Sequence, residues 1–548
     1  MFKTISDHRA FIIYIIFATI YLGMQMFQGF SFLDIGIYMS GYQHFSNEPH
    51  TTYYLGQWLL TYQLSSLICK ALTIKTFLGI RLLHLALTIL SQTVIYFYLR
   101  QYVRPRHIIA GLTLATLAHF GSYTEINYND YSIFLLTLSI LAAHHGMTRS
   151  RAFAIMLSGA FAGFAILFRI VNLTFLALPV MIWLVSLRRL MAIGTRKICF
   201  AFFTGAFLGL ALALSIVYAG NMQDVLRLTV MDITRITGGA DDCHSLPTII
   251  ISAYTLYKGV IQGIAPVLLL TVLITLGNIH LRGARRFVAN AALSILIIVN
   301  IYLWEAPANI TVGICLAALP VVFLCKDMRT DTASLFLLSL FIPVVFPIGS
   351  NAGPEFYGKD ICHLTLPLAV GMMAEGIKRI KEKYQAAVGR SLRLGFVMVC
   401  AAMVYTNVKR PMMEDGNRLQ CRYTIDSELT QGILTTKENA DMYNQLIHTL
   451  KPMLPEGSYM VCNFSIPMIS LLDSKPYAVF STLFTTATMN NRYIDTAYKH
   501  TGRLPYLLLD TQDMSGKDIL VRQYLHSIGK FTEIWSDGRY ILEGPTDK

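Results

Sequence analysis

The sequence predicts a polytopic all-α membrane protein that ends in a small α/β domain. The chain has 548 residues, of which 54% are hydrophobic and only 14% are charged, whereas charged residues make up about a quarter of an ordinary globular domain. The apolar residues gather in blocks of about 16 to 22 residues before position 409, and the rest has the composition of a soluble domain. These observations exclude a wholly soluble protein.

The apolar blocks predict about thirteen transmembrane helices in residues 1–408. They lie near 10–28, 76–98, 106–121, 131–146, 152–168, 171–187, 198–219, 260–279, 287–304, 310–325, 332–349, 361–376 and 394–408. The segment 53–72 is also long enough to span, but it contains Gln57, Gln63 and two serines. We therefore expect it to lie along the membrane surface, within a first external loop at 29–75. The alternative is that 53–72 spans the membrane and the N-terminus is external.

The distribution of charge supports the surface position of 53–72. Lys and Arg exceed Asp and Glu by 45 to 32, a net charge of +13. With 53–72 outside, the cytoplasmic segments hold about 22 basic and 5 acidic residues, against about 8 and 11 in the external loops. Short cytoplasmic loops collect basic residues. The N-terminus is therefore predicted to be cytoplasmic and the tail external, and the basic excess indicates topology rather than a nucleic-acid partner.

The tail, 409–548, alternates helix and strand signals. KENADMYNQLIHTLKPM predicts a helix, GSYMVCNF a strand, IPMISLLDS a short helix and LPYLLLD a buried strand. FTEIWSDGRYILEG predicts a hairpin that turns at Asp537-Gly538. The chain contains no GxGxxG, GxxxxGK[ST], HExxH or GxSxG pattern. Nucleotide-binding, zinc-protease and serine-hydrolase functions therefore have no support.

Asp34 is the acidic residue whose position is most informative. It follows the first span at the start of the first external loop, within reach of the membrane surface. A carboxylate there can take a proton from an acceptor hydroxyl while its neighbours hold a lipid-linked substrate. The simpler interpretation is that Asp34 caps the helix that follows.

The order of these features resembles the GT-C superfamily. In this chain, the first span is followed by a long external loop that contains Asp34, Gly36 and Tyr38 and the expected surface helices. Many further spans and an external α/β tail come after it. GT-C enzymes are glycosyltransferases that use polyprenyl-phosphate sugars, and they include protein O-mannosyltransferases and lipid A aminoarabinose transferases. The chain departs from the pattern at Ile35, where many members have Glu. No role of that Glu can be carried over.

The resemblance implies roles for individual residues. Asp34 matches the catalytic base of the first external loop. A second acidic site usually lies in the next external loop, which here is GSYTEINYNDYS and offers Glu125 and Asp130. Either carboxylate would orient the acceptor or a basic partner. The alternative is a solvated turn between two spans.

A polyprenyl-phosphate donor also requires cations near the outer membrane face. Arg169, in ILFRIVN between two apolar blocks, is the first candidate, because a charge at this depth is costly and usually has a function or partner. The alternative is an Arg that snorkels from a helix end. Lys359 and His363, in the Gly-rich loop GSNAGPEFYGKDICH, are further candidates.

Other ionisable residues have simpler explanations. Glu305, after Trp304, is interpreted as an interfacial cap. Asp241, Asp242 and His244 lie together in the loop 220–259, where a divalent ion is one possibility and a solvated acidic turn is favoured. The nine cysteines show no CxxC pair, and we expect most of them to be apolar filler.

The resemblance therefore implies an inverting glycosyltransferase at the external face of a bacterial cytoplasmic membrane. Its partners would be a polyprenyl-phosphate-linked sugar, a lipid, glycan or protein acceptor and membrane lipids, with no nucleic acid, cofactor or obligatory metal implied. The alternatives are a transporter or flippase of lipid-linked glycans and a non-enzymatic scaffold. Transporters commonly show internal repeats and charges near the midplane, and no repeat is evident in this chain.

Overall fold

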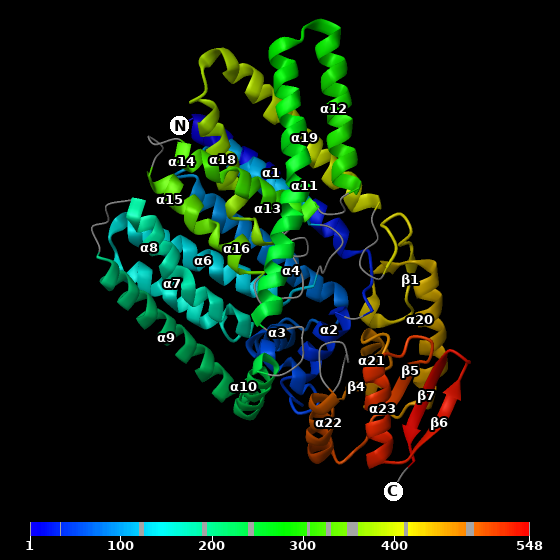
Figure 1. The fold of residues 1–548 in the computed structure, drawn as a ribbon. Helices are drawn as coiled ribbons and strands as arrows, with labels where there is room; N and C mark the ends of the chain where they lie inside the picture. The colour runs from blue at the N-terminus through cyan, green and yellow to red at the C-terminus, as the bar shows by residue number, and fades with distance from the viewer. Residues whose placement is uncertain are drawn as a thin grey trace.

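The computed structural model describes residues 2–32, 34–119, 125–188, 194–238, 246–303, 307–324, 330–347, 360–409, 415–477 and 487–546. Residues up to 409 form helices, and residues from 415 onward form a mixed α/β part (Figure 1). The predicted fold class, a helical polytopic chain with a small C-terminal α/β region, is confirmed.

The helices of the first part are α1 (Phe2–Met26), α2 (Asp34–His44), η1 (Tyr53–Trp58), α3 (Leu59–Ala71), α4 (Phe77–Leu99), α5 (Pro105–Leu117), α6 (Tyr128–Arg149), α7 (Ala152–Ala165), η2 (Ile170–Ala177), α8 (Leu178–Arg188), α9 (Thr195–Ala219), α10 (Gln223–Gly238), α11 (Leu246–His280), α12 (Gly283–Leu303), α13 (Pro307–Ala317), α14 (Leu319–Leu324), α15 (Thr330–Ser339), α16 (Phe341–Val345), α18 (Thr365–Ile377) and α19 (Glu382–Lys409).

Six of the described helices are long and apolar enough to cross a membrane: they lie in α1, α4, α9, α11, α12 and α19. Five shorter apolar helices accompany them. Each of the thirteen predicted blocks coincides with helical structure, and the total of about thirteen spans stays a prediction. Helix α3 has 13 residues and directly follows η1, and α5 and α18 within predicted spans are equally short. Helix length therefore does not decide whether 53–72 spans, and its surface position stays a prediction.

Two details of the predicted layout are wrong. The region 220–259 is mostly helical rather than a loop, because α10 occupies most of its first half and α11 begins at Leu246. The blocks 310–325 and 332–349 are each divided into two short helices, α13 with α14 and α15 with α16. A continuous apolar run does not indicate where a helix breaks.

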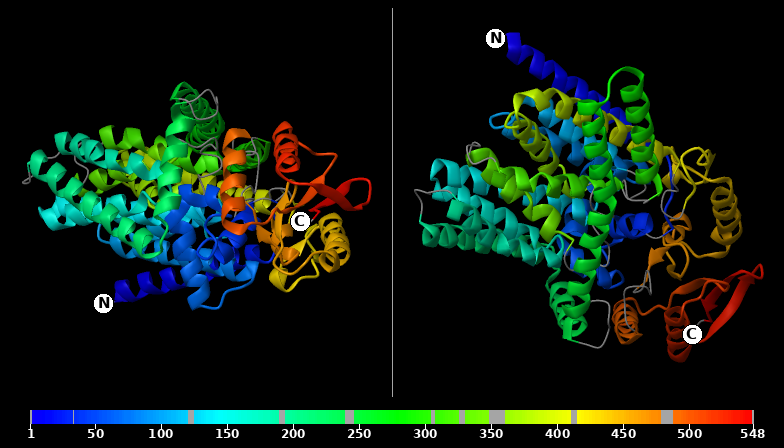
Figure 2. Two further views of the ribbon diagram at one scale, coloured as in Figure 1. Left: turned by 90° about the horizontal axis from the view of Figure 1, so that it is seen from below. Right: turned by 45° about the horizontal axis from the view of Figure 1, so that its top comes forward.

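Helices α6, α7, α8 and α9 lie at one side of the molecule, and the α/β part lies at the other (Figures 1 and 2). Helices α7 and α9 approach backbone to backbone. A Cβ added at Gly163 would lie 2.0 Å from the Ala206 carbonyl oxygen, and one at Gly209 would lie 2.0 Å from that of Ala160. Small residues spaced four apart allow such close contact between helices in a membrane.

The α/β part contains β1 (Tyr423–Thr424), η3 (Glu428–Thr430), β2 (Leu434–Thr435), α20 (Lys437–Leu450), η4 (Lys451–Met453), β3 (Tyr459–Cys462), α21 (Pro467–Leu471), β4 (Lys475–Pro476), α22 (Ala487–Thr501), β5 (Tyr506–Asp510), α23 (Gly516–Ile528), β6 (Phe531–Ser536) and β7 (Tyr540–Pro545). The main sheet has the order β4-β3-β5-β7-β6, with β4, β3 and β5 parallel and β7 and β6 antiparallel. The predicted helices, strands and hairpin of the tail are all present. Gly538 adopts a φ of +92° in the hairpin turn, a conformation that glycine tolerates.

The α/β part packs closely against the first loop. Buried Asp415 accepts hydrogen bonds from the Phe30 amide at 2.8 Å and the Thr435 hydroxyl at 2.6 Å. Helix α2 lies on α21 so tightly that a Cβ added at Gly36 would be 2.2 Å from the Pro467 nitrogen. The glycine of the Asp34, Gly36, Tyr38 pattern therefore has a packing role. The first loop and the α/β part share one hydrophobic core.

Candidate active site

The candidate site begins at α2, the helix that Asp34 opens. The Asp34 side chain lies outside the described residues. Tyr38, one turn further along α2, lies 6.5 Å from the Tyr128 ring, measured between ring centroids. At the end of this helix, burial lowers the pKa of His44 to about 4, so that its imidazole is neutral at pH 7.

Arg169 lies at the N-cap of η2 and is only 5% exposed. Its guanidinium carbon is 5.8 Å from the Tyr128 ring centroid and 4.9 Å from that of Phe346. Nη1 donates a long hydrogen bond to the Phe346 carbonyl oxygen at 3.4 Å. The Tyr128 ring is stacked in turn on Trp58, with ring centroids 4.9 Å apart and an angle of 12° between the ring planes. We call Tyr38, Trp58, Tyr128 and Phe346 the ring cluster. A cation over aromatic faces is stabilised by the ring quadrupoles. The burial of Arg169 within the protein does not support the snorkelling alternative.

Glu125 is 2% exposed and is paired with an arginine that the sequence analysis did not select. The Nε of Arg81 donates to Glu125 Oε1 at 2.7 Å. The two Nη groups of Arg81 donate to the carbonyl oxygens of Met26 at 2.7 Å and Gly29 at 2.8 Å, where α1 ends. The guanidinium therefore fixes the start of the first loop to the second acidic loop. The solvated-turn alternative is wrong for Glu125.

Asp130 has two structural contacts. It is the N3 residue of a capping box, and its Oδ2 accepts a hydrogen bond from the Asn127 amide at 2.8 Å. The same oxygen lies 3.0 Å from His84 Nδ1. Asp130 is largely buried, so the solvated-turn alternative is wrong for this residue too. The capping box explains why α6 begins at Tyr128.

A second His–Asp contact lies beside the first. His119 Nε2 is 2.8 Å from Asp360 Oδ1, and the rings of His84 and His119 are 5.2 Å apart. His363, three residues after Asp360 in the chain, is also buried. We call Arg81, His84, His119, Glu125, Asp130, Asp360 and His363 the ion-pair cluster. Among the described residues, no group of three or more His, Cys, Asp and Glu side chains has the arrangement of a metal site.

Both clusters lie at one end of the helical part. Tyr128 and Asp130 are both in the first turn of α6, Arg81 and His84 are near the start of α4, and His119 follows the end of α5. Because successive helices run in opposite directions, the start of α4, the end of α5 and the start of α6 lie at the same end of the helical part. The contacts described above join these three termini. Arg81 and His84 were missed although both stand within the predicted span 76–98, and a charged residue in an apolar block was the available signal.

Several selected residues cannot be located. Lys359, Glu305, Asp241, Asp242 and His244 all lie outside the described residues.

Among the described residues, the structure joins Arg169 to the helix of Asp34 through Tyr38 and Tyr128. It also brings Glu125, Asp130 and His363 close to the start of α6 and the end of α5.

Comparisons with known proteins find similar solved structures but no similar sequence. No protein-family model matches the chain, and no curated protein sequence matches it. Among solved structures, the chain is similar to the oligosaccharyltransferase of Archaeoglobus fulgidus, crystallised as a complex with zinc and sulfate. The TM-score is 0.47 and the sequence identity 10%, over 97% of this chain and 73% of that chain.

Proposed function

We propose that this protein is an integral-membrane glycosyltransferase of GT-C type that transfers a sugar from a polyprenyl-phosphate carrier to a hydroxyl acceptor. One observation carries the proposal. The helix that Asp34 opens contacts Tyr128 through Tyr38, and the Tyr128 ring lies beside the buried guanidinium of Arg169. A carboxylate and a cation that attend the same reaction must lie near one set of substrate-binding groups.

The proposed reaction is an inverting displacement. The acceptor oxygen forms a bond to the anomeric carbon while the bond from that carbon to the phosphate oxygen breaks. Asp34 takes the acceptor's hydroxyl proton as general base. Arg169 pairs with the negative charge that develops on the leaving phosphate, with Lys359 and His363 as further phosphate-binding candidates. The ring cluster provides apolar faces against which a sugar ring or a polyprenyl chain can lie.

Glu125 and Asp130 are proposed to position the site rather than to react. Each already accepts a hydrogen bond from a basic side chain, Arg81 and His84 respectively. These contacts join the end of α1, the start of α4 and the start of α6, around the loop that carries Asp34. The second acidic site would therefore act by holding that loop in place.

The position of the buried charges favours an enzyme over a transporter. Arg81 and His84 lie in the first turns of α4, Asp130 in the first turn of α6, and Arg169 at the N-cap of η2. Transporters commonly place such groups near the midplane of the membrane. Groups at helix ends suit chemistry at the membrane surface.

The decisive experiment is Asp34→Asn in the purified protein, supplied with radiolabelled polyprenyl-phosphate sugar. A general base contributes roughly 100 to 10,000-fold, whereas loss of a helix cap costs only about 1 kcal/mol of stability. Asparagine retains the shape and capping capacity of Asp34 but cannot take the proton. Transfer by the variant should fall at least 100-fold with donor binding unchanged.

Glu48→Gln is the matched control, because Glu48 is a second carboxylate of the first loop that pairs with Lys475 of the α/β part. It should retain most of the parent rate. Transfer by Asp34→Asn at more than about a tenth of the parent rate would contradict the base role. Glu125 and Asp130 would then be the next carboxylates to test.

The proposed orientation places the first loop and the α/β part outside a bacterial cytoplasmic membrane. Alkaline phosphatase fused at Asn47 or Asn463 should be active, and the same enzyme fused at Gly194 should be inactive. An inactive fusion at Asn47 would show that 53–72 spans the membrane and that Asp34 faces the cytoplasm.

A further inference from the structure

The strand order of the α/β part points to a second ligand site. The chain runs from β3 to β4 on one side and then returns to β5 on the other side of β3, so that the order is β4-β3-β5 with all three strands parallel. The order therefore reverses between β3 and β5. In open α/β sheets, ligands bind outside the carboxyl ends of the strands at such a reversal. In this sheet those ends are Asn463, directly after β3, and Asp510, the last residue of β5.

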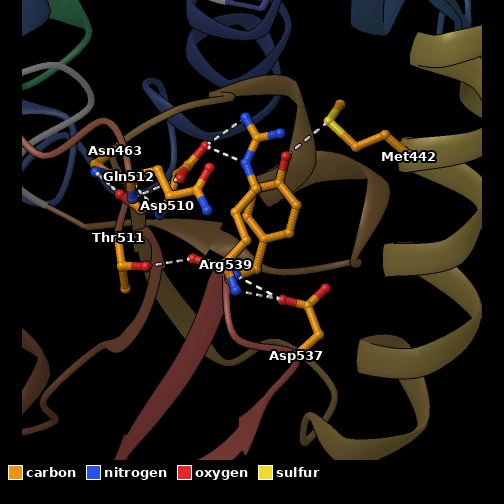
Figure 3. Close-up of polar contacts among 8 residues, drawn as sticks. Met442, Asn463, Asp510, Thr511, Gln512, Asp537 and Arg539 are labelled. Carbon is orange, nitrogen blue, oxygen red and sulfur yellow. Dashed lines mark hydrogen bonds and ion pairs between the residues drawn. The ribbon is translucent and has the colours of Figure 1, made fainter.

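Polar side chains meet at this reversal (Figure 3). The Asp510 amide donates to Asn463 Oδ1 at 2.8 Å, which joins the two strand ends. Arg539, from the turn between β6 and β7, donates from Nε at 3.0 Å and from Nη2 at 2.8 Å to Asp510 Oδ2. The other carboxylate oxygen, Oδ1, accepts a hydrogen bond from the Gln512 amide at 3.0 Å.

The exposure of the pair is asymmetric. The Asp510 side chain is 3% exposed, whereas that of Arg539 is 53% exposed. A guanidinium has five N–H donors, and two of those of Arg539 are used by Asp510. Both N–H groups of Nη1 have no partner within the described part of the chain. Fixed donors of Arg539 therefore face solvent at the place where the fold favours a ligand.

Two aromatic rings lie beside these donors, the half-buried ring of Phe464 and the buried ring of Tyr540 beneath Arg539. The guanidinium carbon of Arg539 is 4.9 Å from the Tyr540 ring centroid. The ring of half-buried Phe464, which follows Asn463, is 4.8 Å from that of Tyr540. The Tyr540 hydroxyl donates to Met442 Sδ at 3.2 Å, which holds the ring in place. The exposed guanidinium and the accessible part of the Phe464 ring can contact the hydroxyls and the C–H face of a sugar, respectively.

The charge balance selects the class of ligand. Arg539 is neutralised by Asp510, so an anion would meet the carboxylate as well as the guanidinium and would gain little. A neutral polyhydroxylated molecule uses the free donors without that repulsion. We propose that Asn463, Phe464, Asp510, Gln512 and Arg539, supported from beneath by the buried Tyr540 ring, form a saccharide-binding subsite.

The subsite is close enough to Asp34 to hold the acceptor. The Ile466 amide, three residues after Asn463, donates to the Phe32 carbonyl oxygen at 2.8 Å, and Phe32 is two residues before Asp34. Because a chain extends at most about 3.6 Å per residue, the Cα atoms of Asn463 and Asp34 lie within roughly 25 Å. A glycan of several sugars can bridge that distance. The subsite therefore identifies the acceptor as a glycan chain, an assignment that rests on the proposed glycosyltransferase function.

The test measures saccharide binding without sugar transfer. Full-length protein in nanodiscs is applied to a broad array of immobilised glycans, and the glycan that is retained most strongly is titrated in soluble form. Arg539→Ala should weaken its binding at least tenfold, and Arg539→Lys should weaken it less. The matched control is Arg522→Ala, because Arg522 is an exposed partner of a buried carboxylate of the same sheet, Glu543. The control should bind as the parent does.

Three outcomes would overturn the proposal: no glycan retained by the parent, an equal loss of affinity in Arg522→Ala, or displacement of the glycan by millimolar inorganic phosphate. The last outcome would identify an anion site instead. Asp34→Asn should bind the glycan as tightly as the parent. If the parent binds the glycan and catalyses no transfer from any polyprenyl-phosphate sugar, the enzymatic function fails and the saccharide subsite stands.

Discussion

The interface of α7 with α9 and the ion-pair cluster hold helices together by opposite means. Gly163 and Gly209 bring two backbones into direct contact, and apolar side chains fill the space around them. In the ion-pair cluster, Arg81 and Glu125 are buried as a charge pair. A buried ion pair adds little net stability compared with apolar packing of the same volume. The first interface therefore serves stability, whereas the second maintains a costly arrangement at the end where the candidate site lies.

The largest predicted effect on stability is that of Glu125→Ala. This change leaves the guanidinium of Arg81 buried without its carboxylate, at a cost of about 3–5 kcal/mol. Thermal unfolding of the protein in nanodiscs should show a markedly lower midpoint. The double variant Arg81→Met, Glu125→Leu should recover much of the loss. An unchanged midpoint in Glu125→Ala would mean that the pair is already hydrated.

Arg169→Gln tests whether the charge within the ring cluster serves binding. Loss of hydrogen bonds from a charged group to phosphate costs about 1.5–3 kcal/mol, or roughly tenfold or more in affinity for a polyprenyl phosphate. Arg169→Lys keeps the charge but loses the planar fork, and donor affinity should fall by an intermediate amount while the protein still folds. Equal affinity of Arg169→Gln and the parent in a binding titration would remove Arg169 from the site.

Gly163→Ala tests the apolar side of the comparison. The added methyl group would lie 2.0 Å from a backbone oxygen, so α7 and α9 must move apart, at a cost of about 1–3 kcal/mol. Gly259→Ala is the matched control, because nothing lies within 4 Å of its Cβ position in helix α11. There alanine should stabilise the helix by several tenths of a kcal/mol. Thermal unfolding midpoints of the two variants are measured in one lipid composition. Equal midpoints for Gly163→Ala and Gly259→Ala would contradict the close contact between α7 and α9.

The smallest effect should come from Glu48→Gln, which breaks a partly exposed pair with Lys475. Such pairs contribute about 0–1 kcal/mol. The unfolding midpoint should shift little, and the shift should shrink further in high salt, which screens exposed charges. A loss as large as that of Glu125→Ala would show that the contact between first loop and α/β part controls folding.

Sequence reasoning was most successful where a single periodic pattern decides the structure. Each predicted apolar block coincides with helix, and the hairpin at Asp537-Gly538 is present, since hydrophobic runs and an Asp-Gly turn are local signals. It was least successful for pairing. Nothing near Glu125 in the chain identifies Arg81, 44 residues earlier, as its partner. The sequence left a solvated turn and a functional carboxylate as open alternatives for this loop.

By itself, the sequence determined the helical class and the α/β tail, because composition and periodicity are written along the chain. It offered Arg169 as a candidate because a charge stands between apolar blocks, and Asp34 because of its place after the first span and the resemblance to GT-C enzymes. Only the tertiary structure decided that Arg169 lies between Tyr128 and Phe346, that Gly36 is packed against Pro467, and that Asn463 and Asp510 meet at one end of a sheet. Each of these contacts joins segments far apart in sequence. Such contacts depend on how helices and strands pack, and packing is a property of the whole fold rather than of any local pattern.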